Sequence, residues 1–216
     1  MTENPTPQSV WDEMRRGNAR FVSGEPRHPR QDVDRRNELA GGQRPTAALF
    51  GCSDSRLAAE IIFDEGLGDL FVVRNAGQVI SDSVVGSLEY AVAVLEVPLI
   101  VVLGHDACGA VNAAIESTRL DAPALPALIW RQIAPIVPAA RRVIRGSMVD
   151  GMPSAPVDAE AVGREHLRDT VATLLHSSEL ISNAVAEGRL GIVGANYRLA
   201  EGTAVPSISL GVTSDA

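Results

Sequence analysis

The chain has 216 residues, of which 45% are hydrophobic, 21% are charged and 4% are aromatic. This length and apolar fraction are typical of one folded domain and argue against a disordered chain. The 27 acidic and 19 basic residues give a net charge of −8, which argues against binding nucleic acid or anionic membranes through general electrostatics. A locally basic pocket remains compatible with this charge.

Targeting and membrane signals are absent from the sequence pattern. The N-terminal residues have no long apolar core and include acidic residues such as Glu3, so we expect no signal peptide. The most apolar stretch, residues 91–103, is too short to span a bilayer. The two cysteines, Cys52 and Cys108, exclude a disulfide-stapled scaffold. We therefore expect a soluble, cytoplasmic protein with no membrane or nucleic-acid partner.

The first half of the chain is typical of an α/β protein with a mainly parallel sheet flanked by helices. The segment 9–22 is expected to be a helix capped by Ser9, and 27–44 a polar surface loop with at most one helical turn. Continuous apolar runs then predict strands that are buried on both faces, with helices between them. The expected strands are 46–50, 70–73 and 99–103, and the expected helices between them are about 58–65 and 83–96.

The second half continues the alternation of helices and strands. Its expected elements are, in order, a helix after Cys108, a helical region over about 124–143, a loop over 146–158, a long helix over about 159–187, a strand over 190–197 and an additional strand over 204–211. No internal repeat or linker divides the chain. We therefore expect a single domain, made of an N-terminal helical arm (1–44), an α/β core (45–200) and a C-terminal strand extension (201–216).

Residues that can bind a metal follow two of the expected strands. Cys52 comes after the strand 46–50, and His105 and Cys108 come after the strand 99–103. The carboxyl ends of parallel strands meet at one edge of a sheet, where such folds bind ligands. Each residue alone could be an ordinary buried Cys or a hydrogen-bonded His. Together, two thiolates and an imidazole are a zinc-ligand set with one coordination position left open, so the pattern favours a metal site.

Three motifs resemble those of the β-class carbonic anhydrases. They are Cys52-x-Asp54-Ser55-Arg56, Arg74-Asn75-Ala76-Gly77 and Gly104-His105-x-x-Cys108-Gly109. The likeness extends from the opening helix to the strand that ends at Tyr197, so it covers most of the chain. It implies the reversible hydration of CO2 to bicarbonate and a proton, with one zinc ion per subunit.

The resemblance also implies the roles of matching residues. Cys52, His105 and Cys108 match the zinc ligands, and Asp54 and Arg56 match the catalytic Asp–Arg dyad. In this mechanism zinc-bound hydroxide attacks CO2, while Asp54, held by Arg56, accepts a hydrogen bond from the hydroxide. Asp54 can instead bind zinc as a fourth ligand, and we hypothesise that this closed state dominates below neutral pH.

The resemblance implies further assignments around the substrate. Gln43 matches the position of a substrate-orienting amide, and Gly109, Val79 and Tyr90 are the other candidates for the substrate pocket. A second subunit completes this pocket in the family. We therefore expect a homodimer or homotetramer.

Some members of the family have a second bicarbonate site that holds the enzyme inactive. Arg74 and Tyr197 resemble two residues of that site. The third position carries Trp in those members but is Leu49 here, and Leu57 is larger than the usual Val. These differences argue against regulation by bicarbonate.

Other functions remain as alternatives. A cysteine-dependent phosphatase needs a longer loop than Cys52-x-x-x-Arg56 to surround a phosphate with backbone N–H groups. A hydrolase that acts on CS2 or COS would use the same scaffold. A non-catalytic zinc or thiol sensor would need a closed site, whereas the nearby fourth candidate, Asp54, is a ligand that can leave. The remaining histidines, His28, His166 and His176, carry no functional signal in the sequence.

Overall fold

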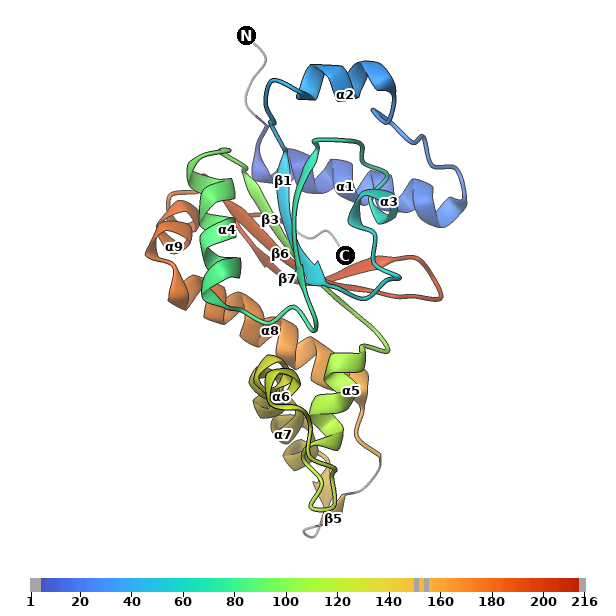
Figure 1. The fold of residues 1–216 in the computed structure, drawn as a ribbon, viewed down its shortest axis with the longest axis vertical. Coiled ribbons are helices and arrows are strands. Elements are labelled where there is room, and N and C mark those ends of the chain that lie inside the picture. The colour runs from blue at the N-terminus through green and yellow to red at the C-terminus, as the bar shows by residue number, and fades with distance from the viewer. Residues whose placement is uncertain (1–4, 150–151, 154–155, 214–216) are drawn as a thin grey trace.

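A five-stranded sheet runs through one part of the molecule, and a helical lobe lies beyond the ends of its strands (Figure 1). The computed structural model describes residues 5–149, 152–153 and 156–213. Within the sheet the strand order is β2-β1-β3-β6-β7. The strands are β1 (Ala47–Cys52), β2 (Leu70–Asn75), β3 (Leu99–His105), β6 (Gly191–Tyr197) and β7 (Ala204–Leu210).

The central strands are buried and parallel, as their continuous apolar runs predict. All residues of β1 and β3 are buried, and Ala48 on β1 pairs with Phe71 on β2 and with Ile100 on β3. β6 continues the parallel sheet beside β3. β7 is antiparallel to β6 and closes this edge, so the sheet is mixed. The prediction of an α/β fold with a mainly parallel sheet is confirmed.

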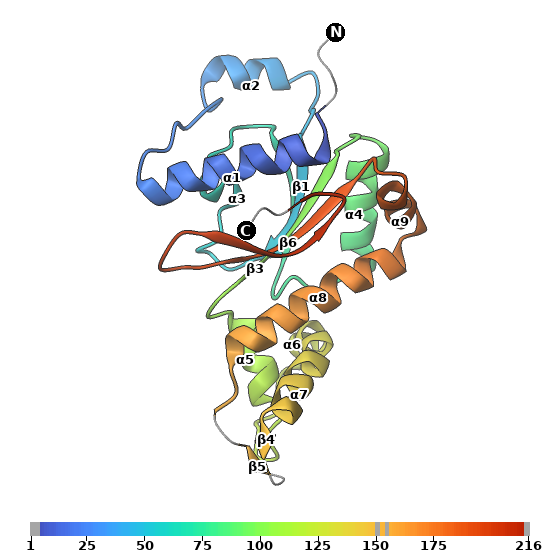
Figure 2. The same cartoon turned by 180° about the vertical axis from the view of Figure 1, so that it is seen from behind.

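Helices cover both faces of the sheet (Figures 1 and 2). One hydrophobic cluster joins the sheet to α4, α8 and α9, and a second joins its other face to α1 and α3. No helix in the described part of the chain is long and apolar enough to cross a membrane. The helices are α1 (Pro7–Ser23), α2 (Val33–Leu39), α3 (Ala59–Ile62), α4 (Asp82–Ala93), α5 (Gly109–Glu116), α6 (Ala127–Ile133), the 3₁₀ turn η1 (Ala134–Ile136), α7 (Val137–Gly146), α8 (Ala159–Ser177) and α9 (Glu179–Ala186).

The N-terminal arm is more helical than the sequence predicts. α1 begins earlier than expected and is capped by Thr6, whose hydroxyl accepts from the backbone N–H of Ser9, while the Ser9 hydroxyl accepts from that of Thr6. The segment expected to be a loop with at most one turn contains the seven-residue helix α2. Asp32 caps α2 by accepting from the backbone N–H of Arg35 at 2.8 Å.

Two expected helices are shorter than the sequence predicts. The helix expected over 58–65 is only the four-residue α3, because the backbone turns left-handed at Asp64, with φ of 50°. The helix expected over 159–187 is broken at Ser178, which is extended and caps α9 through its hydroxyl. The loop expected over 146–158 contains a short hairpin of β4 (Met148–Val149) and β5 (Met152–Pro153). Residues 150–151 and 154–155 of that loop lie outside the described residues.

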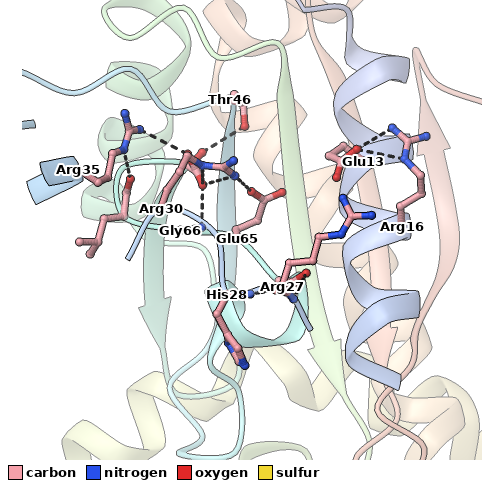
Figure 3. Close-up of polar contacts among 12 residues, drawn as sticks. Glu13, Arg16, Arg27, His28, Arg30, Arg35, Thr46, Glu65 and Gly66 are labelled. Atoms are coloured by element: carbon pink, nitrogen blue, oxygen red, sulfur yellow. Dashed lines mark hydrogen bonds and ion pairs between the residues drawn. The ribbon is translucent and has the colours of Figure 1, made fainter. Parts of the chain in front are cut away.

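Ion pairs hold the polar segment before α2 against the core (Figure 3). Arg30 donates from Nε to Asp69 Oδ2 at 2.7 Å and from Nη2 to Glu65 Oε2 at 3.1 Å. Glu65 and Asp69 are both buried, although Arg30 itself is half exposed. Burial, together with the neighbouring charge of Asp69, raises the pKa of Glu65 to about 7. This carboxyl group therefore titrates near neutral pH.

Candidate active site

The neighbouring parallel strands β1 and β3 bring the three expected metal ligands together. β1 ends at Cys52 and β3 ends at His105, and Cys108 caps the N-terminus of α5 three residues later. All three side chains are buried, and their ligating atoms lie within 4.8 Å of one another. This cluster stands at the carboxyl edge of the sheet, as the sequence predicts.

His105 has the hydrogen bonding of a metal ligand. Its Nδ1 lies 2.8 Å from the backbone carbonyl oxygen of Asp106, which requires a proton on Nδ1 and leaves a lone pair on Nε2. Nε2 is buried and has no hydrogen-bond partner among the described residues. An imidazole that is oriented by a backbone carbonyl and presents a free nitrogen to two thiols fits a zinc ion.

The two cysteines form a coupled pair of thiols. A hydrogen bond from Cys108 lowers the pKa of Cys52, and the backbone N–H of Gly77 also donates to its sulfur at 3.3 Å. The Cys52 thiolate and burial raise the pKa of Cys108. Cys52 is therefore the more readily ionised of the two thiols. Such a soft, ready donor pair suits zinc.

Asp54 and Arg56 form an ion pair beside this cluster. Arg56 donates from its backbone N–H and from Nε to Asp54 Oδ1, and from Nη2 to Asp54 Oδ2. These hydrogen bonds from Arg56 hold the pKa of Asp54 far below its usual range. Asp54 Oδ2 lies 4.0 Å from His105 Nε2. An ionised carboxylate thus stands next to the metal ligands but is engaged by Arg56.

Arg74 supports the loop that carries Cys52 and Asp54. Its Nε donates to the carbonyl oxygen of Cys52 at 2.9 Å, and its Nη2 donates to that of Asp54 at 2.6 Å. Leu49 and Tyr197, the two other positions compared with the regulatory site, are both buried. Arg74 is therefore engaged with backbone in the site, and Leu57 is buried in the core below it.

The expected substrate residues lie in different places. Gly109 is exposed and begins α5 directly after Cys108. Val79 is buried in the loop after β2, and Tyr90 is half exposed on α4, with its ring 6.1 Å from that of Phe71. Gln43 is exposed before the start of β1, whereas Cys52 ends that strand. The length of β1 separates Gln43 from Cys52 by about 20 Å. Gln43 therefore lies at the amino edge of the sheet, whereas the Cys-His-Cys cluster of the same chain lies at the carboxyl edge.

His166 is a polar residue close to this cluster, and the sequence analysis predicts no role for it. It is buried on α8, and its Nε2 lies 2.7 Å from the carbonyl oxygen of Gly77, the residue that also donates to Cys52. A signal was present, because His166 falls on the apolar face of α8. A polar ring at such a position needs a partner. The other buried residues of that face are Val162, Gly163, Leu167, Thr170, Val171 and Leu174.

The chain resembles known proteins over most of its length. The sequence model of the carbonic anhydrase family matches residues 47–204. "Carbonic anhydrase 2" of Mycobacterium tuberculosis is 50% identical over 206 residues, which are 94% of this chain and 93% of that protein. The carbonic anhydrase of Mycolicibacterium smegmatis is 47% identical over 199 residues, 92% of each chain.

Solved structures agree with this assignment. The β-carbonic anhydrase CafA of Aspergillus fumigatus is 25% identical and superposes with a TM-score of 0.69, covering 92% of this chain and 89% of its own. A β-carbonic anhydrase of Sordaria macrospora has the same fold, with a TM-score of 0.70 at 23% identity over 94% of this chain and 99% of its own.

The mainly parallel α/β sheet carries, at its carboxyl edge, a Cys-His-Cys cluster that could hold a metal ion. The chain belongs to the carbonic anhydrase family, in its β class, and is a carbonic anhydrase.

Proposed function

We propose that this enzyme hydrates CO2 reversibly to bicarbonate and a proton, with one zinc ion per subunit held by Cys52, His105 and Cys108. The observation that supports this most directly is the convergence of these three buried ligands beside an ionised Asp54 that is engaged by Arg56. Zinc bound there would act as a Lewis acid and lower the pKa of a bound water molecule towards neutral pH.

Asp54 orients the attacking oxygen in this proposal. Its carboxylate stays ionised and keeps free lone pairs beside the bonds to Arg56, so it can accept a hydrogen bond from the deprotonated water. That bond turns the remaining lone pair of the oxygen towards CO2. A bond then forms between this oxygen and the carbon, one C=O double bond becomes C–O⁻, and bicarbonate leaves. The proton that the attacking water lost passes to the solvent. Arg56 is the positioning residue that fixes the rotamer of Asp54.

The charge of the site fits a neutral substrate. Two thiolates balance the charge of a zinc dication, His105 is neutral, and Asp54 and Arg56 cancel one another. A site without net charge has no electrostatic preference for retaining the bicarbonate anion after the reaction. Gly109 beside Cys108, and the more remote Val79 and Tyr90, are our candidates for contacts with CO2.

We further propose that the enzyme is a homodimer or homotetramer in which Gln43 serves a neighbouring subunit. Within one chain Gln43 lies at the wrong edge of the sheet to reach its own Cys52. The related Sordaria macrospora enzymes are described as tetrameric. A cytoplasmic location is also proposed, because two buried cysteines that remain thiols suit a reducing compartment.

Stopped-flow CO2 hydration tests the proposed reaction when it is measured from about pH 6.5 to 9 on zinc-loaded and chelated protein. We expect turnover that rises with pH, disappears on chelation and returns when zinc is added. A folded, zinc-loaded protein without turnover at any pH would contradict the proposal. Assays of the same sample with COS and CS2 would then show whether it acts on a sulfur-containing substrate instead.

A further inference from the structure

Helix α8 passes beneath the carboxyl edge of the sheet and contacts the loop that follows β2 (Figure 1). His166 of α8 is 3% exposed, and its Nε2 lies 2.7 Å from the carbonyl oxygen of Gly77, which is 89 residues away in the chain. The backbone N–H of Gly77 makes a separate hydrogen bond and donates to Cys52 Sγ at 3.3 Å. Gly77 therefore connects the buried imidazole to a zinc-ligand sulfur.

The loop around Gly77 has little freedom of its own. Asn75 closes it by accepting from the backbone N–H of Val79 at 2.9 Å and donating to the Val79 carbonyl oxygen at 2.7 Å. Gly77 has φ of 79°, and a Cβ there would stand 2.8 Å from Ala110 Cβ. Gln78 is also left-handed, with φ of 40°, which is costly for a residue other than glycine. A conformation of this kind persists only when its surroundings hold it.

We propose that His166 is a positioning residue that holds the Gly77 carbonyl so that the Gly77 N–H remains aimed at the Cys52 sulfur. An N–H donor to a thiolate withdraws negative charge from the sulfur, which then donates less to the metal. A less strongly donating Cys52 makes the metal a stronger Lewis acid. This inference rests on the zinc binding proposed above and adds a residue from a distant helix to the support of the site.

The protonation of His166 fits this role. A carbonyl oxygen only accepts hydrogen bonds, so the proton must be on Nε2. Nδ1 is buried and has no partner among the described residues, and burial lowers the pKa of His166. A neutral imidazole with one hydrogen bond is a costly choice on the buried face of α8, which also carries Val162 and Thr170 one turn to either side. Packing alone would be served by another aliphatic side chain.

The hydrogen bond to the sulfur can be measured directly in protein loaded with ¹¹³Cd in place of zinc. A hydrogen bond from an amide to a metal-bound sulfur transmits a scalar coupling between the cadmium nucleus and the amide proton. We expect the Gly77 amide proton to show this coupling in the unmodified enzyme. Absence of the coupling in the metal-loaded protein would overturn the proposal without any variant having to fold.

Three variants test the part played by His166. His166→Gln keeps an N–H donor at nearly the same reach, and His166→Leu removes it. Thr170→Val is the control, because Thr170 is equally buried one turn further along α8 and donates to the carbonyl oxygens of His166 at 2.9 Å and Gln78 at 3.4 Å but not to that of Gly77. We expect His166→Leu to weaken the Gly77 coupling and to raise the pH midpoint of CO2 hydration by about 0.5 to 1 unit, the shift that corresponds to the loss of one hydrogen bond.

His166→Gln and Thr170→Val are expected to keep both values close to those of the unmodified enzyme. Unchanged coupling and pH midpoint in a folded His166→Leu protein would overturn the role of His166. An equal change in Thr170→Val would also overturn it, because the effect would then not require the hydrogen bond from His166 to the Gly77 carbonyl oxygen. Failure of CO2 hydration in the unmodified enzyme, with the Gly77 coupling present, would contradict the proposed reaction but not the hydrogen bond.

Discussion

Arg56 binds Asp54 through two parallel hydrogen bonds, from Nε to Oδ1 at 2.8 Å and from Nη2 to Oδ2 at 2.7 Å. The backbone N–H of Arg56 adds a third bond to Oδ1 at 3.0 Å. Such fork-to-fork pairing fixes the plane of a carboxylate as well as its charge. The pair is only partly covered, so its importance lies in orientation next to the metal ligands rather than in stability.

Asp54→Asn should therefore abolish catalysis without unfolding the protein. An amide in place of the carboxylate cannot offer two acceptor oxygens, and we expect the rate of CO2 hydration to fall about 10²-fold or more. Zinc content and the thermal unfolding midpoint should stay close to those of the unmodified enzyme. The matched control is Asp121→Asn, because Asp121 forms the same kind of forked pair with Arg119 on the surface. An equal loss of activity in both variants would contradict the assigned role.

The buried carboxyl of Glu65 should make stability depend on pH. Its folded-state pKa of about 7 lies above the ordinary value of 4.5, so its favourable contribution is complete below pH 4.5 and is lost as pH rises through 7. Glu65→Gln should raise the free energy of unfolding by about 1 to 3 kcal/mol at pH 8 and much less at pH 5. Urea denaturation at the two pH values measures this difference.

Glu13→Gln is the control for that experiment. Hydrogen bonding to Arg16 lowers the pKa of Glu13, so its removal should act in the opposite direction: any loss of stability should be greater at pH 8 than at low pH. If Glu65→Gln raised the free energy of unfolding equally at pH 5 and pH 8, the Glu65 carboxyl would not titrate in this range.

Gln43 can be tested by mixing two inactive subunits. We expect Gln43→Ala to lower activity while leaving zinc in place, and His105→Ala to remove zinc from its own subunit. In a mixed dimer, one site would combine the intact Cys52, His105 and Cys108 of the first variant with the Gln43 of the second. Co-expression should therefore restore activity above that of either variant alone. No restoration in confirmed mixed dimers would place Gln43 outside the neighbouring site.

Two helical glycines should respond to alanine with opposite signs. A Cβ on Gly17 of α1 would stand 1.8 Å from the carbonyl oxygen of Phe63, so Gly17→Ala should lower the free energy of unfolding by about 1 to 3 kcal/mol. A Cβ on Gly86 of α4 meets nothing within 4 Å, so Gly86→Ala should raise it by about 0.5 to 1 kcal/mol. Thermal denaturation of the two variants compares them. A stable Gly17→Ala protein would show that α1 does not pack this closely on Phe63.

The sheet and the metal cluster could be predicted because both follow from local patterns. Strands buried on both faces must be apolar throughout, and the segments containing Leu49 and Val101 show this directly. Once those strands are parallel neighbours, Cys52 and His105 meet at one edge without further information.

The remaining features depend on contacts between distant segments. Within residues 159–187, Ser178 followed by Glu179 is the local signal for a new helix start. A serine also fits within a helix, and the contact of the Ser178 hydroxyl with Glu89 on α4 exists only in the complete fold. His166 acquires a partner only when α8 crosses the loop at Gly77. Patterns in one segment do not contain such information, because each feature requires the fold to be complete.

The placement of the metal ligands on β1 and β3 also orders the events of folding. Cys52 and His105 are separated in the chain by β2 and α4, and they meet only after these have folded back to pair β3 with β1. The chain must therefore meet the entropy cost of this long-range closure before a complete metal site exists. We therefore expect zinc to bind the finished sheet and to slow its unfolding, while the pairing of the strands sets the rate of refolding.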